Sequence, residues 1–428
     1  MIRIINAEFV EPEGTSDEKK EIWADNGRII KIGTGLPDGF EDAGDVTVID
    51  ASGCMVAPGL IDTHVHFRDP GFTYKEDITT GAAAAAAGGY TTVVCMANTN
   101  PPVDNVDVLK DLIRREKELP IHVLQTANVT MGMQGKEVVD MEELAKAGAA
   151  GFTDDGKPIM DEGVLSEALH QACRLDKPIS LHEEAAGLIG SNGVNMGEVS
   201  RKVNVAGAPN TAEEVMVARD GVLNADIGAP LIIQHLSSAG SVEIIKELKQ
   251  HNIRIYAEVT PQHFSLTEEA VLEKGALAKV NPPLRSEYDK ERLIKGLAEG
   301  VLDVIATDHA PHSKEEKEAG IEKAPSGMIG LETALALGIT NLVRPGKLTM
   351  KELILKMTEN PAKIYGLDAG KLYEGGPADI VIFDPNEKWT VSAEGFHGKS
   401  TNSPFIGDEL YGRVKYTICD GKIVYSDR

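Results

Sequence analysis

The chain has 428 residues, of which 42% are hydrophobic and 26% are charged, and its formal net charge is −24. The length exceeds the size at which one hydrophobic core keeps growing, so we expect one large domain and one smaller domain. A negative field of this size repels nucleic acid and anionic lipid, which excludes both as expected partners. The longest small-residue run, from Gly81 to Gly89, is too short to cross a bilayer, so no membrane association is expected.

The two ends of the chain share a pattern of short runs separated by turns, with no long helical segment. Near the N-terminus the runs are Arg3–Phe9, Glu21–Ala24, Arg28–Gly33 and Val46–Asp50. Near the C-terminus they are Asp379–Phe383, Trp389–Val391, Gly412–Cys419 and Lys422–Tyr425. Runs of this length bounded by turn residues are typical of strands. Residues 1–53 and 366–428 are therefore predicted to form one small β-sandwich domain, into which the rest of the chain is inserted.

Between residues 54 and 365, apolar runs rich in β-branched residues alternate with helical segments. Eight runs are predicted as strands: Met55–Phe67, Thr91–Asn98, Ile121–Val129, Ala149–Asp155, Pro178–Glu183, Pro230–Leu236, Ile253–Val259 and Leu302–Asp308. The helical segments include Asp104–Lys117, Glu162–Leu175, Ala212–Asn224, Ser241–His251 and Glu287–Gly300. Eight strand–helix alternations in about 300 residues indicate an α/β fold of the (β/α)8 class, the TIM barrel.

The cysteines bear on the compartment of the protein. Four are present, Cys54, Cys95, Cys173 and Cys419, and they are far apart and form no CxxC pair. In a chain of this length such spacing does not indicate a disulfide framework, so we expect a cytoplasmic location. All four thiols are expected to be buried as small hydrophobic groups.

Side chains suited to metal binding stand at the ends of five predicted strands. They are His64 and His66 on the first, Asp154 and Asp155 on the fourth, His182 on the fifth, His235 on the sixth and Asp308 on the eighth. The carboxyl ends of barrel strands meet in one mouth, where active sites lie. Imidazole and carboxylate groups suit zinc, and five or six of them exceed what one tetrahedral ion needs. The pattern therefore predicts two metal ions that share a carboxylate.

Each of these residues also has a purely structural interpretation. Paired histidines occur on ordinary strands, and an aspartate at a strand end is often the N-cap of the next helix. The joint pattern on five strands favours metal binding. The histidines expected to be structural are His122, His170, His251 and His397. His263 and His309 stay open, either as structural residues or as partners of metal ligands.

Four stretches resemble the amidohydrolase superfamily and, within it, the dihydroorotases of the long bacterial type I class. They are residues 62–70 (DTHVHFRDP), 152–156 (FTDDG), 280–285 (VNPPLR) and 306–312 (ATDHAPH), the last with Lys317 after it. The likeness covers essentially the whole chain. It implies a zinc-dependent, reversible cyclisation of N-carbamoyl-L-aspartate to L-dihydroorotate in pyrimidine biosynthesis.

The resemblance assigns the metal ligands to two zinc ions per subunit. One ion would be held by His64, His66 and Asp308, the other by His182 and His235, and Asp155 would bridge them. Asp155 is chosen over Asp154 because its spacing to His182 matches the family. Asp308 would also act as general acid and base for a metal-bound hydroxide nucleophile.

The resemblance also implies a set of substrate-binding residues. The substrate carboxylate would be bound by Arg68, Asn98 and His312. Asn281 would contact the pyrimidine edge, and the backbone at Ser326 and Gly327 would close the pocket. A guanidinium forms a bidentate pair with a carboxylate, which dihydroorotate has and a plain hydantoin lacks.

Two other functions are compatible with the same fold. A hydantoinase or allantoinase would share the metal chemistry, but such enzymes typically bridge their metals with a carboxylated lysine, where this chain has Asp154 and Asp155. A catalytically inactive homologue would serve as a scaffold for aspartate carbamoyltransferase, but such proteins have lost metal ligands and this chain keeps all six. The resemblance suggests a homodimer and leaves open an association of an active enzyme with aspartate carbamoyltransferase.

The segment Ser191–Pro209, between the fifth and sixth predicted strands, is rich in glycine and asparagine. A mobile active-site loop and a surface excursion without function are both compatible with it.

Overall fold

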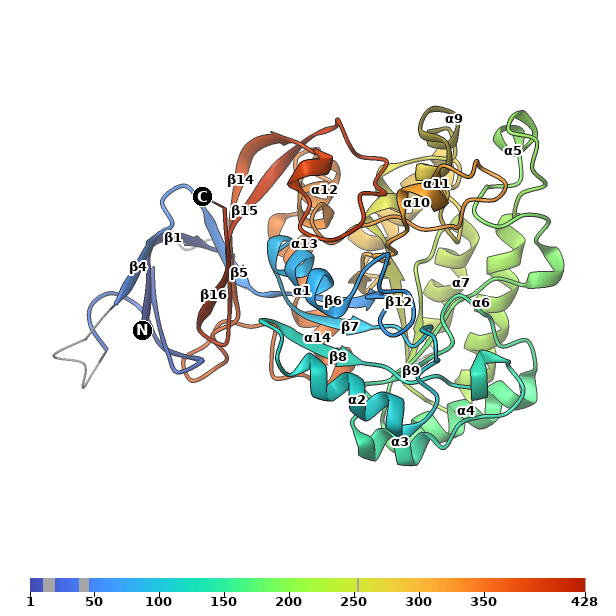
Figure 1. The fold of residues 1–428 in the computed structure, drawn as a ribbon, viewed down its shortest axis with the longest axis horizontal. Helices are drawn as coiled ribbons and strands as arrows, with labels where there is room; N and C mark the ends of the chain where they lie inside the picture. Colours follow the sequence, from blue (N-terminus) through green and yellow to red (C-terminus); the bar gives the residue numbers. More distant parts are fainter. Residues whose placement is uncertain (11–19, 38–45, 252–253, 428) are drawn as a thin grey trace.

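The computed structural model describes residues 1–10, 20–37, 46–251 and 254–427. Figure 1 shows a barrel wrapped by helices and, on one side of it, a smaller unit of strands that contains both ends of the chain. The chain passes from the small unit to the barrel between β5 (Met55–Pro58) and β6 (Leu60–Val65), and it leaves the barrel after α14 (Glu359–Tyr365). The predicted fold is confirmed: the protein is a (β/α)8 barrel of the α/β class with a small β-sandwich domain.

Eight parallel strands form the barrel. After β6 they are β7 (Tyr90–Cys95), β8 (His122–Gln125), β9 (Phe152–Thr153), β10 (Ile179–Leu181), β11 (Leu231–Ile233), β12 (Ile255–Val259) and β13 (Val304–Ile305). The pairing is continuous from β6 to β8 and from β9 to β13. Single parallel bridges, Ala127 with Phe152 and Val65 with His309, close the two remaining gaps. Most residues of these strands are buried, as expected for a parallel sheet covered by helices.

Helices follow the strands and cover the outside of the barrel (Figure 1). The α-helices before the tail are α1 (Ile78–Ala87), α2 (Val106–Glu116), α3 (Met141–Ala147), α4 (Glu162–Leu175), α5 (Glu198–Lys202), α6 (Asn210–Ala225), α7 (Ala239–Gln250), α8 (Pro261–Ser265), α9 (Ala270–Lys274), α10 (Glu287–Ala298), α11 (Lys314–Lys317), α12 (Ala334–Gly338), α13 (Met350–Lys356) and α14. The five predicted helices are confirmed as α2, α4, α6, α7 and α10. Helix α4 begins where predicted because the Asp161 carboxylate accepts hydrogen bonds from the backbone N–H of Gly163 and Val164.

Five short segments complete the helical part of the structure. The 3₁₀ turns are η1 (Met131–Met133), η2 (Ala186–Leu188), η3 (Gly275–Ala278) and η5 (Ala393–Gly395), and η4 (Ile339–Val343) is a π-helix that continues α12. No helix among the described residues is long and apolar enough to span a membrane.

The small domain is an eight-stranded sheet that folds over on itself at β1 (Ile2–Phe9). Its other strands are β2 (Lys20–Asp25), β3 (Arg28–Ile32), β4 (Thr47–Asp50), β5, β14 (Ile380–Thr390), β15 (Glu409–Cys419) and β16 (Lys422–Ser426). The first half of β1 pairs with β2 and β4, and its last residues pair with β5. Apolar side chains from both halves, such as Ile4, Ile22 and Ile380, pack between the layers. The two predicted strands at Asp379–Phe383 and Trp389–Val391 belong to the one strand β14.

The first predicted barrel strand, Met55–Phe67, is in fact two strands in different sheets. β5 pairs with β1 and β14 in the small domain, whereas β6 pairs with β7 in the barrel. Gly59 lies at the break, where a Cβ atom would come within 2.1 Å of the Thr91 side chain. We therefore propose that the small domain comprises residues 1–58 and 366–428 and the barrel residues 59–365. The seventh predicted strand began at Ile253, which lies outside the described residues.

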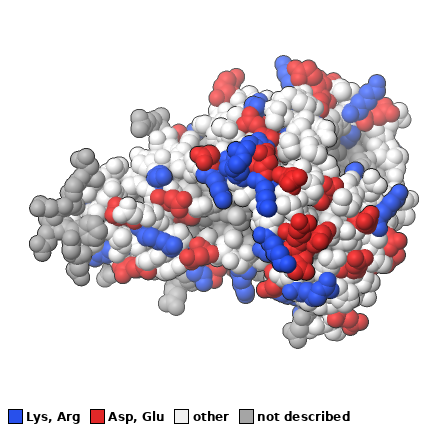
Figure 2. Space-filling model, turned by 60° about the horizontal axis from the view of Figure 1, so that its bottom comes forward, with Lys and Arg blue, Asp and Glu red and all other residues white. Residues whose placement is uncertain are grey.

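The charged side chains are mixed on the face that Figure 2 shows, where Lys and Arg stand next to Asp and Glu. Binding to a nucleic-acid backbone needs a concentrated basic surface, which this face does not present. The four cysteines are unpaired: Cys95 and Cys419 are buried as predicted, and Cys54 and Cys173 are half-buried.

Candidate metal centre and substrate pocket

The six predicted metal ligands lie together at the carboxyl ends of the barrel strands, and all six are buried. His64 is in β6, and the others follow the strands β6, β9, β10, β11 and β13: His66, Asp155, His182, His235 and Asp308. They come from distant parts of the chain and meet because the parallel strands of a barrel end at one rim.

The first group of ligand atoms belongs to two histidines and two aspartates. Nε2 of His64 lies 3.5 Å from Oδ1 of Asp155 and 3.6 Å from Oδ1 of Asp308. Nε2 of His66 lies 3.3 Å from Oδ2 of Asp155 and 3.0 Å from Oδ1 of Asp308. Two ligand atoms on one tetrahedral zinc ion would be about 3.3 Å apart, given its ligand bond lengths. The group therefore has the spacing of a metal site.

The second group shares Asp155 with the first. Nδ1 of His182 lies 3.0 Å from Nε2 of His235, and these atoms lie 3.8 Å and 3.6 Å from Oδ1 of Asp155. Among the described residues, the buried atoms Nε2 of His64 and Oδ1 of Asp155 have no hydrogen-bond partner. Unpaired buried polar atoms are costly unless an ion or water satisfies them. The residues thus fit a pair of cations that share Asp155.

The backbone around the cluster is strained at two ligand positions. His235 and Asp308 have positive φ angles of 33° and 49°, and Arg68 beside them has a φ of 59°. Residues other than glycine rarely adopt this conformation, and it persists at functional sites where the surrounding structure enforces it. The strain turns both ligand side chains to the mouth of the barrel.

Hydrogen bonds to residues outside the cluster fix the orientation of three histidines. In each, the ring nitrogen that faces away from the cluster donates its N–H to a carboxylate or amide oxygen. The pairs are His64 Nδ1 with Glu258 Oε2 (3.3 Å), His66 Nδ1 with Asn98 Oδ1 (2.9 Å) and His182 Nε2 with Glu184 Oε2 (3.0 Å). Such partners set the tautomer and raise the basicity of a metal ligand. The sequence analysis missed Glu258 and Glu184, although Glu258 interrupts the apolar strand β12 and offered a signal.

The charges in the cluster favour a cation. Burial opposes ionisation, but His64 and His235 hold the pKa of Asp155 well below its usual range. The pKa of Asp308 is likewise lowered, since His66 outweighs the effect of burial. Burial also opposes a charged His64, yet Asp155 raises its pKa well above the usual value. The carboxylates of Asp155 and Asp308 are thus ionised. The positive charge that pairs with them is the proton on His64, which a metal ion can displace.

The two adjacent aspartates after β9 point in different directions. Oδ1 of Asp154 accepts hydrogen bonds from the backbone N–H of Val129 (2.9 Å) and Thr130 (3.3 Å) and from the amide of Asn128 (3.3 Å). Asp154 therefore holds the loop after β8, while Asp155 faces the histidines. This geometry favours Asp155 as the bridging ligand.

A pocket of about 380 Å³ opens above the cluster. All the predicted substrate-binding residues line it: Arg68, Asn98, Asn281, His312, Ser326 and Gly327. The Arg68 guanidinium is held through Nε, which donates to the Pro311 carbonyl at 3.2 Å. Its Nη2 lies 3.5 Å from Nε2 of His312, and the remaining terminal N–H groups can bind an anion in the pocket.

His312 and Asn98 are both engaged within the protein. Nε2 of His312 donates to the Ser326 carbonyl at 2.9 Å, and Nδ1 lies 3.2 Å from Nζ of Lys75. Burial, together with Arg68 and Lys75, lowers the pKa of His312 to about 2, so its imidazole is neutral. The Asn98 amide lies between His66 and Asp155. Both residues therefore help to position the pocket wall as well as line it.

The segment Ser191–Pro209 reaches the pocket. Asn192 lines it, and a Cβ at Gly193 would come within 2.3 Å of Oγ of Ser326. The buried Arg285 anchors the segment by donating to Oδ1 of Asn195 at 2.9 Å and to the Ala208 carbonyl at 2.6 Å. The segment is thus part of the pocket wall.

Comparisons with known proteins agree with this geometry. Residues 55–424 match the sequence pattern of the amidohydrolase family. The chain is 53% identical over 427 residues to a dihydroorotase of Clostridioides difficile and 54% identical over 428 residues to a dihydroorotase of Clostridium acetobutylicum. Each comparison covers 100% of both chains. This chain belongs to the dihydroorotases of the amidohydrolase family.

Solved structures of other amidohydrolases share the fold. An L-hydantoinase from Arthrobacter aurescens is 26% identical and superposes with a TM-score of 0.87, covering 99% of this chain and 96% of that one. A D-hydantoinase is also 26% identical, with a TM-score of 0.86 and coverage of 99% and 95%. The barrel and the β-sandwich domain are therefore common to amidohydrolases with different substrates.

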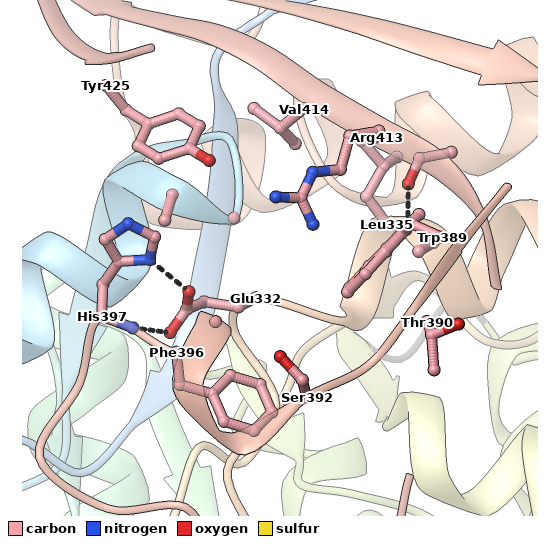
Figure 3. A pocket seen from close by; sticks show the side chains of 15 residues that line it. Glu332, Leu335, Trp389, Thr390, Ser392, Phe396, His397, Arg413, Val414 and Tyr425 are labelled. Carbon is pink, nitrogen blue, oxygen red and sulfur yellow. Dashed lines mark hydrogen bonds and ion pairs between the residues drawn. The ribbon is translucent and has the colours of Figure 1, made fainter. Parts of the chain in front are cut away.

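A second cavity of this amidohydrolase, of about 200 Å³, lies between α12 and the β14–β15 hairpin, away from the metal centre. Figure 3 shows that its carboxylate, Glu332, is already bonded to the backbone N–H and Nδ1 of His397, both at 2.8 Å. The Trp389 N–H donates to the Gly412 carbonyl at 2.9 Å. These internal bonds satisfy the polar groups, so this cavity is not the candidate active site.

Replacing Glu258 by glutamine tests the outer hydrogen bond to His64. The amide keeps the size of the side chain but loses the charge that orients the imidazole, so we expect metal affinity to fall about 10- to 100-fold. Excess metal should restore most activity. The measurement is a metal titration of the metal-free protein followed by enzyme activity.

Glu116→Gln is the matched control for this variant, because Glu116 is a buried carboxyl group on α2 without a hydrogen-bond partner among the described residues. Its variant should titrate like the unaltered protein. An unchanged metal affinity in Glu258→Gln would remove Glu258 from the support of the metal centre.

Proposed function

We propose that this protein is a dihydroorotase that interconverts N-carbamoyl-L-aspartate and L-dihydroorotate in pyrimidine biosynthesis. The observation that carries the proposal is full-length identity of 53–54% to dihydroorotases, together with a half-buried guanidinium, Arg68, in the pocket above the carboxylate–histidine cluster. A substrate with a carboxylate needs such a partner.

We propose that the cluster binds two zinc ions. His64, His66 and Asp308 would hold one, His182 and His235 the other, and Asp155 both; the spacings and the unpaired buried atoms support this set. When bound, zinc supplies a Lewis acid for the amide carbonyl and lowers the pKa of a coordinated water to near neutrality.

Asp308 is the proposed proton carrier. Its Oδ1 lies 3.0 Å from Nε2 of His66, and the residue lines the substrate pocket, so the carboxylate adjoins both the cluster and the pocket. In hydrolysis it takes the proton of the attacking water and delivers it to the leaving ring nitrogen, and in synthesis it removes a proton from the ureido nitrogen. Its lowered pKa keeps it ionised and ready to accept that proton at neutral pH.

The substrate is oriented by the residues of the pocket wall. Arg68 binds the carboxylate, with His312 and Asn98 beside it, and Asn281 contacts the edge of the ring. The backbone at Ser326 and Gly327 closes the pocket over the ring. A neutral His312 has one N–H group, which donates to the Ser326 carbonyl, so the imidazole holds the pocket wall in place beside Arg68.

Replacing Arg68 by methionine tests carboxylate binding. A lost charged hydrogen bond costs about 1.5–3 kcal/mol, so KM for dihydroorotate should rise about 10- to 100-fold with a smaller change in kcat. Arg254→Met is the control, because Arg254 is exposed and pairs with Asp176 instead. Steady-state kinetics decide the question, and an unchanged KM in Arg68→Met would exclude a role in substrate binding.

The alternatives make different predictions for substrate choice. A hydantoinase or allantoinase would turn over hydantoin or allantoin, and a scaffold protein would turn over none of the three substrates. Neither alternative is favoured, because the chain has all six predicted metal-ligating residues and is 53–54% identical to dihydroorotases. Parallel assays with dihydroorotate, hydantoin and allantoin test the proposal, and it predicts turnover of dihydroorotate alone.

The partners and location stay predictions. We propose a homodimer, which light scattering of the purified protein tests, and an association with aspartate carbamoyltransferase, which co-purification of the two proteins tests. The unpaired cysteines support a cytoplasmic location, which fractionation of cells would check.

A further inference from the structure

A second cluster of ligand-type side chains lies at the opposite end of the barrel from the substrate pocket. His122 is the first residue of β8, and Cys419 is the last residue of β15 in the small domain. Asp379 precedes β14 and Asp420 follows β15. In Figure 1 β8 lies on the side of the barrel next to the small domain, where β14 begins and β15 ends. The cluster therefore sits on the junction between the two domains.

The ligand atoms of this cluster are close together. Nε2 of His122 lies 3.2 Å from Oδ2 of Asp379 and 3.7 Å from Oδ1 of Asp420. Nitrogen, sulfur and carboxylate oxygen of His122, Cys419 and Asp379 all lie within 4.8 Å of one another. Around a tetrahedral zinc ion, sulfur and nitrogen would be about 3.5 Å apart. The upper limit of 4.8 Å exceeds this spacing by about an ångström. The distances between the three ligand atoms would therefore have to shorten by no more than about that amount to bind one ion.

We propose that His122, Asp379, Cys419 and Asp420 form a further metal site, for a divalent ion of the zinc class, which links the barrel to the small domain. The sequence analysis treated His122 as structural and Cys419 as a small hydrophobic group. Imidazole, thiolate and carboxylate are the ligand types of zinc, and a set of four closes its coordination as in a structural site.

The surroundings prepare two of these ligands. Oδ1 of Asp379 accepts a hydrogen bond from the Asp420 backbone N–H at 2.8 Å, which orients the carboxylate so that Oδ2 faces His122. Cys419 is 2% exposed and Asp379 is 6% exposed. The side chains of His122 and Asp420 are 38% and 63% exposed, so an ion can enter from solvent.

Protons compete with a metal ion for the ligand atoms of this cluster. Hydrogen bonds to Asp379 and Cys419 raise the pKa of His122 to about 11, and burial raises the pKa of the Cys419 thiol. A metal ion must displace both protons, so its affinity rises with pH.

Cobalt(II) distinguishes this site from the metal centre in the pocket. The pocket cluster contains only histidine and aspartate, so cobalt bound there gives no sulfur signal. Cobalt bound to Cys419 gives a thiolate-to-metal charge-transfer band in the near ultraviolet. The experiment titrates the metal-free full-length protein with cobalt(II) at mildly alkaline pH and records the absorption spectrum and the number of ions bound per chain.

The variants are Cys419→Ser, His122→Gln and, as the matched control, Cys173→Ser. Cys173 is a half-buried thiol on α4 whose sulfur faces the Ile227 carbonyl. The proposal predicts the band in the unaltered protein and in Cys173→Ser. It predicts loss of the band and one ion fewer per chain in Cys419→Ser, and a band at least tenfold harder to saturate in His122→Gln.

Two results would overturn the proposal: no charge-transfer band in the unaltered protein at saturating cobalt, or a band that survives in Cys419→Ser. In the first case the cluster is an ion pair between His122 and Asp379 that joins the domains without a metal. Because His122→Gln keeps the thiol, it tests the site even where Cys419→Ser does not fold.

Discussion

Replacing Asp308 by asparagine is expected to lower kcat about 100- to 10,000-fold, the usual contribution of general acid–base catalysis. The amide has the shape of the carboxylate but cannot accept the proton of the attacking water or pass it to the ring nitrogen. KM should change much less, because Arg68 and the pocket wall bind the substrate. Steady-state rates with dihydroorotate, measured with the bound metal quantified in the same sample, give the result.

Asp303→Asn is the matched control for Asp308→Asn. Asp303 lies before β13, at the other end of the same strand, and pairs with Lys249 at 2.6 Å. Its variant should retain kcat. An Asp308→Asn enzyme with metal bound and near-normal kcat would show that another group moves the proton.

Replacing Asp155 by alanine has the second largest expected effect, loss of metal. Its oxygens lie 3.3–3.8 Å from the ligand nitrogens of four histidines, so both ions of the proposed pair depend on it. Metal affinity should fall by more than the roughly 10- to 100-fold that is expected when a residue that only hydrogen-bonds to a metal ligand is removed. Metal content after dialysis and kcat with added zinc are the measurements.

The adjacent carboxylate provides the control. Asp154→Asn should keep its metal and most of its activity, and it should be less stable by about 1–3 kcal/mol because a neutral amide oxygen accepts the hydrogen bonds of Val129 and Thr130 more weakly than a carboxylate. Thermal unfolding measures that loss. If Asp154→Asn lost metal and Asp155→Ala retained it, the bridging role would belong to Asp154.

The barrel could be predicted because its strands and helices have local signals. Helix α4, for example, begins after its N-cap Asp161 and ends before Asp176, as capping and periodicity predict. The break at Gly59 was not predictable from the apolar pattern, because β5 and β6 are both buried and their sheet partners are distant in the sequence. The pairing of β5 with β1, and with β14 more than 300 residues later, separates it from β6.

The ligands could be predicted for a similar reason. A polar residue at the end of a buried strand is unusual, and barrel topology brings such ends together. The choice between Asp154 and Asp155 came from a family resemblance, since it depends on the direction of each side chain. The role of Glu258 depends on a contact between two strands far apart in the sequence, and the role of Glu184, two residues after His182, depends on the direction of its side chain; neither was predicted.

The pocket explains how related enzymes differ within one fold. The solved hydantoinases share the barrel at 26% identity, so the fold alone does not choose the substrate. We propose that selectivity for a carboxylate depends on Arg68 and on the loops that carry His312 and Ser326, which line the pocket and lie outside the barrel strands.

The most direct test of the proposed function is the rate of dihydroorotate hydrolysis, followed by ultraviolet absorbance, in purified protein before chelation, after chelation and after zinc is added back. The account predicts that chelation abolishes hydrolysis and that zinc restores it. Hydrolysis that persists after the metal has been removed, or no hydrolysis with two ions bound per chain, would contradict it.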